Sequence, residues 1–283
     1  MGEGPQTDLL AIGLSATDYV GHAYGTGGAE MCLQMLALDR ELGDFFARMD
    51  ATGIDYAVVL TADHGGHDLP ERNRQNAAPS AVRVDAALDG EALGARIASD
   101  MGLPGPALFS DGPFGDYYIS RDITPAQRAE VERRALSFLR GHPQVAMVLT
   151  NAQLAAMPIP TRSPELWSVE DRVRASFDAQ RSGDFIVVLQ PRVTPIPDSL
   201  ETQIPGSGIG YVATHGSVWD YDRRVPMLFW RRGLAHFEQP NPVMVVDIMP
   251  TLAGLIGLPI AGRSIDGRCL DLVAGPQSSC PGE

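Results

Sequence analysis

Apolar runs that end abruptly in aspartate, histidine and glycine constrain this chain more than any other feature of its sequence. The clearest is VVLTADHGGHD (58–68), in which a strand-like run gives way to Asp63, His64, His67 and Asp68. A surface turn would account for the glycines, but it would not require two carboxylates and two imidazoles so close together. Two other apolar runs end in a similar way: DLLAIGLS leads into ATDYVGH, and YVAT leads into HGSVWDYD.

The first 80 residues predict a strand, a helix and a second strand. DLLAIGLS (8–15) and DYAVVLTA (55–62) are nearly continuous apolar runs, which are typical of strands buried on both faces. Between them, apolar side chains recur at steps of three and four residues and predict a helix that ends at Gly53. These side chains are Met31, Met35, Leu38, Leu42, Phe45 and Met49. This order and spacing predict a right-handed βαβ unit in a parallel sheet.

Residues 81–209 differ in character from the segments on either side. Strand-like YYIS, VAMVLT and FIVVLQ alternate with helical segments, one of which begins with Thr124 as N-cap and Pro125 at its first position. We expect a small α/β insertion, or cap, here. Residues 210–283 then return to core-like sequence, where GYVATHG and VPMLFW predict strands and VVDIMPTLAGLIGLP predicts a closing helix. The expected organisation is therefore core (1–80), insertion (81–209) and core (210–283).

Charge and hydropathy exclude some classes of partner. The net charge of −13 argues against a nucleic-acid partner, because binding phosphate backbones requires clustered lysine and arginine. No apolar run approaches the roughly 18–20 residues that span a bilayer, so we expect no membrane span. The first residues, MGEGPQTDLLAIGLS, do not have the basic region followed by an apolar segment and a small-residue cleavage site that are typical of a signal peptide.

The three cysteines do not form an evident framework. Cys32 lies in a helical pattern and is expected to be a small buried hydrophobic residue. Cys269 and Cys280 flank a tail rich in glycine, proline and serine, and either form a disulfide in an oxidising compartment or remain free.

The polar ends of the three apolar runs predict one common site. In open parallel sheets, ligands bind outside the carboxyl ends of the strands, so the three ends should converge although they are far apart in sequence. The side chains expected to meet there are Asp18, His22, Asp63, His64 and His215. Two carboxylates and three imidazoles are a suitable ligand set for Zn²⁺ or a similar divalent ion.

Other polar residues near these motifs have simpler interpretations. We expect His67 and Asp68 to support the site or lie on the surface, and His142 and His236 to be helix-end and loop residues. The charges that follow the third run either buttress the site or form a solvated loop, and the second interpretation is favoured. These charges are Asp220, Asp222, Arg223 and Arg224.

Together, GLSATDYVGHAYG, TADHGG and ATHGSVWDYDRRVPMLFW resemble the alkaline phosphatase superfamily. The most similar branch is the type I phosphodiesterase/nucleotide pyrophosphatase-like one, which includes atypical bacterial alkaline phosphatases with a threonine nucleophile. The resemblance covers roughly residues 5–80 and 208–270. It implies an α/β fold with a mostly parallel sheet flanked by helices. It also implies two zinc ions, one bound by Asp18, His22 and His215 and the other by Asp63 and His64.

Part of that family pattern is missing here. The second zinc site also needs an aspartate and a nucleophilic threonine or serine, both upstream of the first motif. This chain begins where that motif's strand starts, and Thr26 matches no nucleophile pattern. We therefore expect no catalytic nucleophile in this chain, which reads as the C-terminal part of the fold with a missing N-terminal half as its partner. The resemblance also implies a small-molecule phosphate ester as substrate and a periplasmic or secreted location.

Three functions remain open at this point. The first is a phosphatase or phosphodiesterase that is incomplete without its other half. The second is a non-catalytic metal-binding remnant or interaction module, and the third is a sulfatase or phosphoglycerate mutase relative on the same fold. The sequence THGSVWDYDRRVP favours the first.

Overall fold

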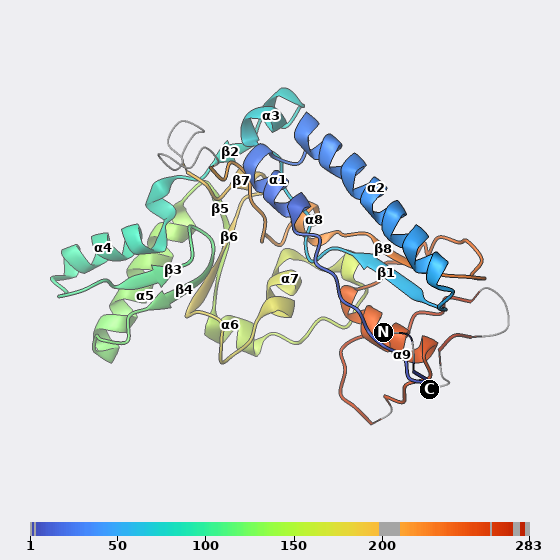
Figure 1. The fold of residues 1–283 in the computed structure, drawn as a ribbon. Helices are drawn as coiled ribbons and strands as arrows, with labels where there is room; N and C mark the ends of the chain where they lie inside the picture. Colours follow the sequence, from blue (N-terminus) through green and yellow to red (C-terminus); the bar gives the residue numbers. More distant parts are fainter. Residues whose placement is uncertain (1, 3, 198–209, 261, 274–277, 281–283) are drawn as a thin grey trace.

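The structure is a computed structural model that describes residues 2, 4–197, 210–260, 262–273 and 278–280. Its helices and strands form two groups, which lie on opposite sides of Figure 1. The group at the right comprises α1 (Ala16–Tyr24), α2 (Ala29–Thr52), β1 (Ala57–Thr61), α3 (Pro70–Gln75), α8 (Asp220–Arg223), β8 (Met227–Arg231) and α9 (Ile248–Leu255). The group at the left is built from residues of the expected insertion.

The expected insertion contains a four-stranded antiparallel sheet in the order β3-β4-β6-β5. Its strands are β3 (Leu108–Ser110), β4 (Gly115–Ile119), β5 (Val145–Thr150) and β6 (Phe185–Leu189). The helices beside it are α4 (Gly90–Met101), α5 (Pro125–Gly141), α6 (Asn151–Ala156) and α7 (Val169–Ser176). As predicted, Thr124 caps α5, and its hydroxyl accepts the N–H of Gln127. A short parallel pair, β2 (Val82–Arg83) with β7 (Val193–Thr194), borders this unit.

Strand β6 lies at the centre of the core, with both of its faces covered. Phe185, Val187 and Leu189 pack into a cluster with α4 and α5, whereas Ile186 and Val188 pack into a second cluster with α6 and α7. This alternation follows from the two-residue period of a strand. The continuous apolar run of β6 thus accompanies burial on both faces, although two-sided burial was predicted for residues 8–15 and 55–62 and not for this strand. The sheet is antiparallel, however, and burial on both faces does not require parallel pairing.

The expected parallel βαβ unit is wrong for the described residues. Strand β1 pairs with β8 in antiparallel register, with Ala57 opposite Arg231 and Thr61 opposite Met227. These two strands form a separate two-stranded sheet, in which β1 and β8 have only each other as neighbours among the described strands. The run 55–62 does form a strand, but the expected burial on both faces is wrong, because no residue of β1 is buried. The direction of its neighbour depends on a segment more than 160 residues away.

Two of the predicted strands are absent from the described structure. Residues 8–15 have no ladder partner, and Leu9 and Leu10 are 82% and 56% exposed. Residues 210–216 are also outside any strand, and the N–H groups of Val212 and Ala213 both point at the carbonyl oxygen of His22. An apolar run forms a strand only when another strand supplies hydrogen bonds, and no described segment does so here.

Helix α2 confirms the predicted stripe but buries little of it. It ends at Thr52, with Gly53 in the left-handed conformation as predicted, yet none of its 24 residues is buried. Within the stripe, Met35 is 50% exposed and the other members are half-buried. Leu33 and Leu36, outside the stripe, are 66% and 58% exposed. Cys32 is exposed too, so the expectation that it would be buried is wrong. No helix within the described ranges is long and apolar enough to cross a membrane.

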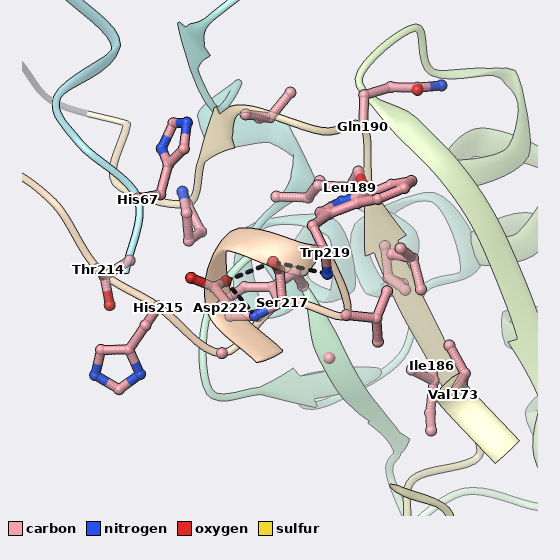
Figure 2. Close-up of a pocket in the computed structure, with 18 of the residues that line it drawn as sticks. His67, Val173, Ile186, Leu189, Gln190, Thr214, His215, Ser217, Trp219 and Asp222 are labelled. Carbon is pink, nitrogen blue, oxygen red and sulfur yellow. Dashed lines mark hydrogen bonds between the residues drawn. The ribbon is translucent and has the colours of Figure 1, made fainter. Parts of the chain in front are cut away.

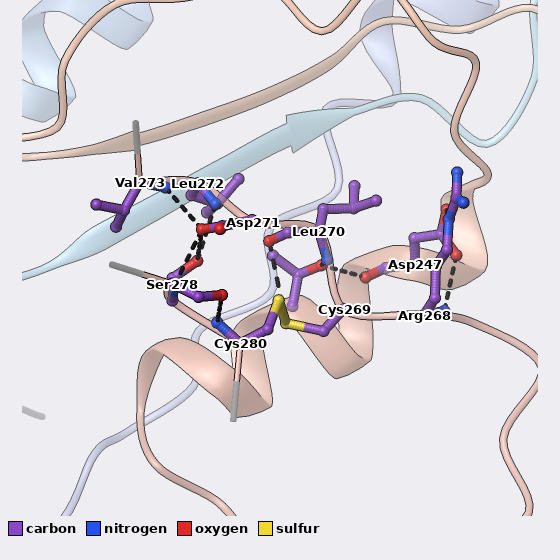
Figure 3. The surroundings of a disulfide bond; sticks show 11 residues. Asp247, Arg268, Cys269, Leu270, Asp271, Leu272, Val273, Ser278 and Cys280 are labelled. Atoms are coloured by element: carbon purple, nitrogen blue, oxygen red, sulfur yellow. Dashed lines mark hydrogen bonds and ion pairs between the residues drawn. A yellow bond between two sulfur atoms is a disulfide. The ribbon is translucent and has the colours of Figure 1, made fainter. Parts of the chain in front are cut away.

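A disulfide joins Cys269 to Cys280, which settles the alternative left open by the sequence (Figure 3). The segment that carries Cys269 is hydrogen-bonded to residues at and just before helix α9. The Arg268 N–H donates to buried Asp247 over 2.9 Å, and the Leu270 N–H donates to the hydroxyl of Thr251 over 2.9 Å. The boundary expected at 209/210 falls beside residues outside the described part, and the three-segment division stays a prediction.

Candidate metal centre

Helix α1 places the first two candidate ligands on one face. Asp18 and His22 are four residues apart, and residues at this spacing are neighbours on a helix surface. Nε2 of His22 lies 3.5 Å from Oδ1 of Asp18. The helix packs against α2, which holds this face in place.

Three imidazoles from three parts of the chain converge on the same carboxylate oxygen. Besides His22, the Nε2 atoms of His64 and His215 lie 3.8 Å and 3.5 Å from Oδ1 of Asp18. The rings of His64 and His215 are stacked, with their centroids 3.4 Å apart and their planes 13° apart. Ligand atoms of Asp18, His22 and His215 all lie within 4.8 Å of one another, a spacing that one cation can bridge.

Hydrogen bonds to the other ring nitrogens orient two of these imidazoles. Nδ1 of His22 lies 2.9 Å from the carbonyl oxygen of Ala213, and Nδ1 of His64 lies 2.8 Å from that of Gly65. A carbonyl oxygen can only accept, so each Nδ1 carries a proton, and in the neutral ring this leaves the lone pair on Nε2. A backbone acceptor of this kind is the usual support of a metal-binding histidine.

The segment that carries His215 is fixed from two sides. The carbonyl oxygen of His22 accepts the N–H of Val212 over 2.8 Å, so α1 holds the segment as well as supplying ligands. The guanidinium of Arg83 donates to the carbonyl oxygen of Val212 over 3.3 Å and pairs with Glu71. These contacts replace the strand pairing that the sequence had suggested.

Burial and neighbouring rings favour the neutral form of His215. Desolvation lowers the pKa of His215 below its usual range, and the nearby imidazoles of His64 and His22 lower that pKa further. The neutral ring is the form that binds a metal ion.

Asp63 stands apart from the other candidates. Its carboxylate is 89% exposed, and Oδ2 lies 3.6 Å from Nε2 of His64. The structure therefore brings Asp18, His22, His64 and His215 together and leaves Asp63 at the edge of the group, beside His64.

The residues beyond the ADHGG motif have supporting contacts. His67 is buried, and its ring nitrogens lie 3.3 Å from the hydroxyl of Thr194 and 3.2 Å from the side-chain nitrogen of Asn73. Asp68 pairs with Arg72 over 2.6 Å, and Arg72 also donates to the last carbonyl oxygen of α1. His142 lies far along the chain beside Asp85, away from this group.

The preference for a solvated loop after His215 was wrong for Asp222. Its side chain is only 4% exposed, and Oδ2 accepts both the N–H and the hydroxyl of Ser217. Figure 2 shows this pair beside a pocket of about 170 Å³, with the ring of His215 pointing away from Leu189 and Trp219. The indole of Trp219 donates to the carbonyl oxygen of Leu189 and so joins the segment to the end of strand β6. The sequence signal was the serine–aspartate spacing in SVWDYD, which is compatible with a local cap.

Three histidines and an aspartate converge beside an α/β scaffold in this chain. Such a group is typical of proteins that bind a metal ion on a fold of this class. The chain belongs to the type I phosphodiesterase / nucleotide pyrophosphatase family, whose model matches residues 3–217. This match confirms the resemblance drawn from the three motifs.

Individual relatives point to one group within that family. Alkaline phosphatase PhoK of a Sphingomonas species is 57% identical over 284 residues, covering 100% of this chain and 50% of the relative. Alkaline phosphatase PhoD of Zymomonas mobilis subsp. mobilis is 49% identical over 283 residues, covering 99% of this chain and 48% of the relative. The chain thus spans about half the length of the curated relatives it matches.

A solved structure supports the fold. The crystal structure of wild-type alkaline phosphatase PafA matches with a TM-score of 0.74 at 24% identity, covering 93% of this chain and 47% of that one. The α/β, alkaline-phosphatase-like fold expected from the sequence is confirmed by this likeness.

Proposed function

We propose that this chain is the metal-carrying part of a hydrolase that acts on small-molecule phosphate esters and uses Zn²⁺. The observation that carries the proposal is the convergence of three imidazole Nε2 atoms on Oδ1 of Asp18. Family membership and the alkaline phosphatase relatives favour phosphate esters over the sulfatase and mutase alternatives.

The chain's own residues supply two unequal sets of ligands. Asp18, His22 and His215 would hold one ion, and their donor chemistry suits Zn²⁺. Asp63 and His64 would hold part of a second, whose remaining ligands we expect to come from outside this chain. A bound Zn²⁺ supplies Lewis acidity toward a phosphoryl oxygen. The carbonyl oxygens of Ala213 and Gly65, which lie against the Nδ1 atoms of His22 and His64, would leave the Nε2 atoms of these rings available as ligands.

The partner we propose is the missing half of the same fold. The relatives have about as much chain outside the match as inside it, and α2 has no buried residue. An amphipathic helix gains most of its stability from packing its apolar face. A polypeptide equivalent to the unmatched half would cover α2 and the exposed run 8–15, and would bring the nucleophilic threonine or serine. We place the assembled protein in the periplasm or outside the cell, where the Cys269–Cys280 disulfide would persist.

Hydrolysis of p-nitrophenyl phosphate tests the activity. The chain is mixed with the half of the Sphingomonas relative that lies outside the match, in the presence of Zn²⁺. We expect turnover from the mixture and little from either piece. Zinc binding without turnover in the mixture would instead support the second candidate, a non-catalytic metal-binding remnant, which the exposed carboxylate of Asp63 favours.

Zinc content tests the ligand assignment directly. We expect His22→Ala and His215→Ala each to lower bound zinc by about one equivalent, and His64→Ala by about one equivalent or less, because each removes a donor to an ion. His142→Ala, whose ring lies beside Asp85, should leave zinc unchanged. Elemental analysis of the dialysed proteins measures this, and equal zinc in all four variants would overturn the assignment.

A further inference from the structure

Asp222 contacts both of the segments that carry stacked candidate ligands. We propose that it is a positioning residue, which holds the ADHGG segment (62–66) and the segment 214–217, here called the THG segment, at a fixed spacing. It would thereby set the distance between His64 and His215. This inference rests on the proposed metal centre and adds a residue that the ligand set does not include.

The side chain of Asp222 holds the THG segment. Its Oδ2 accepts the N–H of Ser217 over 2.8 Å and also accepts the Ser217 hydroxyl. Ser217 lies two residues beyond His215, so holding Ser217 in place restricts the position of the His215 backbone. Figure 2 shows Asp222 and Ser217 side by side, close to the chain segment that carries His215.

The backbone of Asp222 holds the ADHGG segment. Its carbonyl oxygen accepts the N–H of Gly65 over 2.6 Å. Gly65 follows His64 directly, and its own carbonyl oxygen lies 2.8 Å from Nδ1 of His64. A single residue is thus bound to the immediate surroundings of both stacked rings, whose centroids are 3.4 Å apart.

The contact with Gly65 is too close for any side chain. A Cβ at this position would lie 2.1 Å from the carbonyl oxygen of Tyr221. Tyr221 is itself anchored, because its hydroxyl accepts the N–H of Arg192 over 3.0 Å and its ring contacts that of His67. The short helix α8 is therefore a fixed spacer against which the ADHGG segment rests.

The surroundings of the other carboxylate oxygen of Asp222 allow a positioning role to be distinguished from a contribution to stability. Within the described chain, Oδ1 is buried and has no hydrogen-bond partner. Burying a charge that is only partly hydrogen-bonded costs free energy. Asparagine would keep an oxygen for the Ser217 donors without that charge, so D222N should not lower the thermal stability of the metal-free chain.

Zinc affinity of the intact chain, measured by calorimetry, tests the proposal. We expect D222A to weaken Zn²⁺ binding by about 10–100-fold, the usual effect of losing a group that orients ligands, and D222N to restore most of it. The visible spectrum of the Co²⁺-substituted chain should shift in D222A and return in D222N, because the band positions depend on ligand geometry. S217A should add little to D222A, since both remove the same contact.

The matched control is D220A. Asp220 lies in the same helical turn, and its carboxylate pairs with Arg172, Arg223 and Arg224. Its removal should leave affinity and spectrum unchanged. Far-UV circular dichroism identifies any variant that fails to fold. If D222A does not fold, the zinc affinities of D222N and S217A are compared with that of the parent chain instead.

The outcomes separate this inference from the proposed function. An intact chain that binds no Zn²⁺ overturns both. An intact chain that binds Zn²⁺ while D222A binds it equally well overturns the positioning role alone, as does D222N binding no better than D222A. Equal losses in D222A and D220A would show a general effect of charge and would also overturn it.

Discussion

His67 shows how far a single side chain can differ from its neighbours in sequence. It lies three residues beyond His64, yet it is buried between Thr194 and Asn73 rather than facing the ligand cluster. Burial lowers the pKa of His67 below its usual value of 6.5, and only part of this effect is offset by Asp222 and Asp68.

The pH dependence of stability should reflect this histidine. Between its lowered pKa and 6.5, the unfolded chain binds the proton and the folded chain does not. Stability therefore falls as the pH drops through that window and rises as the pH rises. We expect His67→Gln to flatten the decrease in melting temperature between pH 7 and pH 5. His236→Gln, a change at an exposed position, is the control, and parallel curves for His67→Gln and the parent chain would contradict the expectation.

At this scale the sequence was informative about chemistry and poor on burial. The clustering of Asp63 and His64 after an apolar run, and the spacing of Asp18 and His22, pointed to the residues that the structure brings near one another. Asp222 was missed because its burial depends on where Ser217 and Gly65 arrive, and both positions are set by tertiary contacts. The spacing of Ser217 and Asp222 in SVWDYD is compatible with their local contact, but it does not reveal the burial of Asp222 or its contact with Gly65.

Helices α2 and α4 differ in how closely their glycines are packed. Gly94 in α4 faces β3, and a Cβ there would lie 2.6 Å from the backbone nitrogen of Leu108. A Cβ added at Gly43 in α2 would have no other atom within 4 Å. One substitution should therefore have opposite effects in the two helices.

Alanine at each position tests this difference. Gly94→Ala gains helix propensity, but we expect it to lose about 1–3 kcal/mol of stability, because the clash involves backbone and cannot be relieved by a rotamer change. Gly43→Ala should stabilise its helix by up to about 1 kcal/mol. Thermal unfolding followed at 222 nm measures both. Destabilisation by Gly43→Ala would mean that α2 is more tightly covered than the structure indicates.

The elements themselves were predicted well where the period was clear. The stripe in α2, the cap of α5 and the apolar runs of β5 and β6 depend on local spacing, which the sequence contains directly. The pairing of β1 with β8 and the absence of a strand at 8–15 depend on partners, which periodicity does not reveal. The centre was expected at the ends of parallel strands, whereas helix α1 and the loop around His215 carry much of it.

The molecule as a whole has a well-buried core on one side and exposed apolar surface on the other. The fully buried side chains Tyr117, Phe185 and Leu139 all belong to the insertion-like unit. Leu33 on α2 and Leu228 on β8 remain 66% and 57% exposed. The second surface is the one that we expect the missing half to cover.

A matched pair of charge substitutions tests that expectation. Leu33→Glu should weaken association with the unmatched half of the Sphingomonas relative by about tenfold or more, because burying a leucine contributes about 1.5–3 kcal/mol. Ile159→Glu, at a position between α6 and α7 that is 68% exposed, should not affect association. Analytical ultracentrifugation of the mixtures measures both. An equal effect of the two changes, or none from Leu33→Glu, would place the contact elsewhere.

Because the buried core lies on one side of the molecule, the unfolding of the isolated chain is not described by a single free energy. A transition with a single free energy requires that all parts lose their structure together, and such cooperativity comes from a shared interior. Here the sheet of β3, β4, β6 and β5 has its own interior, while α2 contributes no buried side chain to it. The left-hand unit of Figure 1 would therefore remain folded under conditions in which α2 has already opened, so that one chain has two separate thresholds of denaturation.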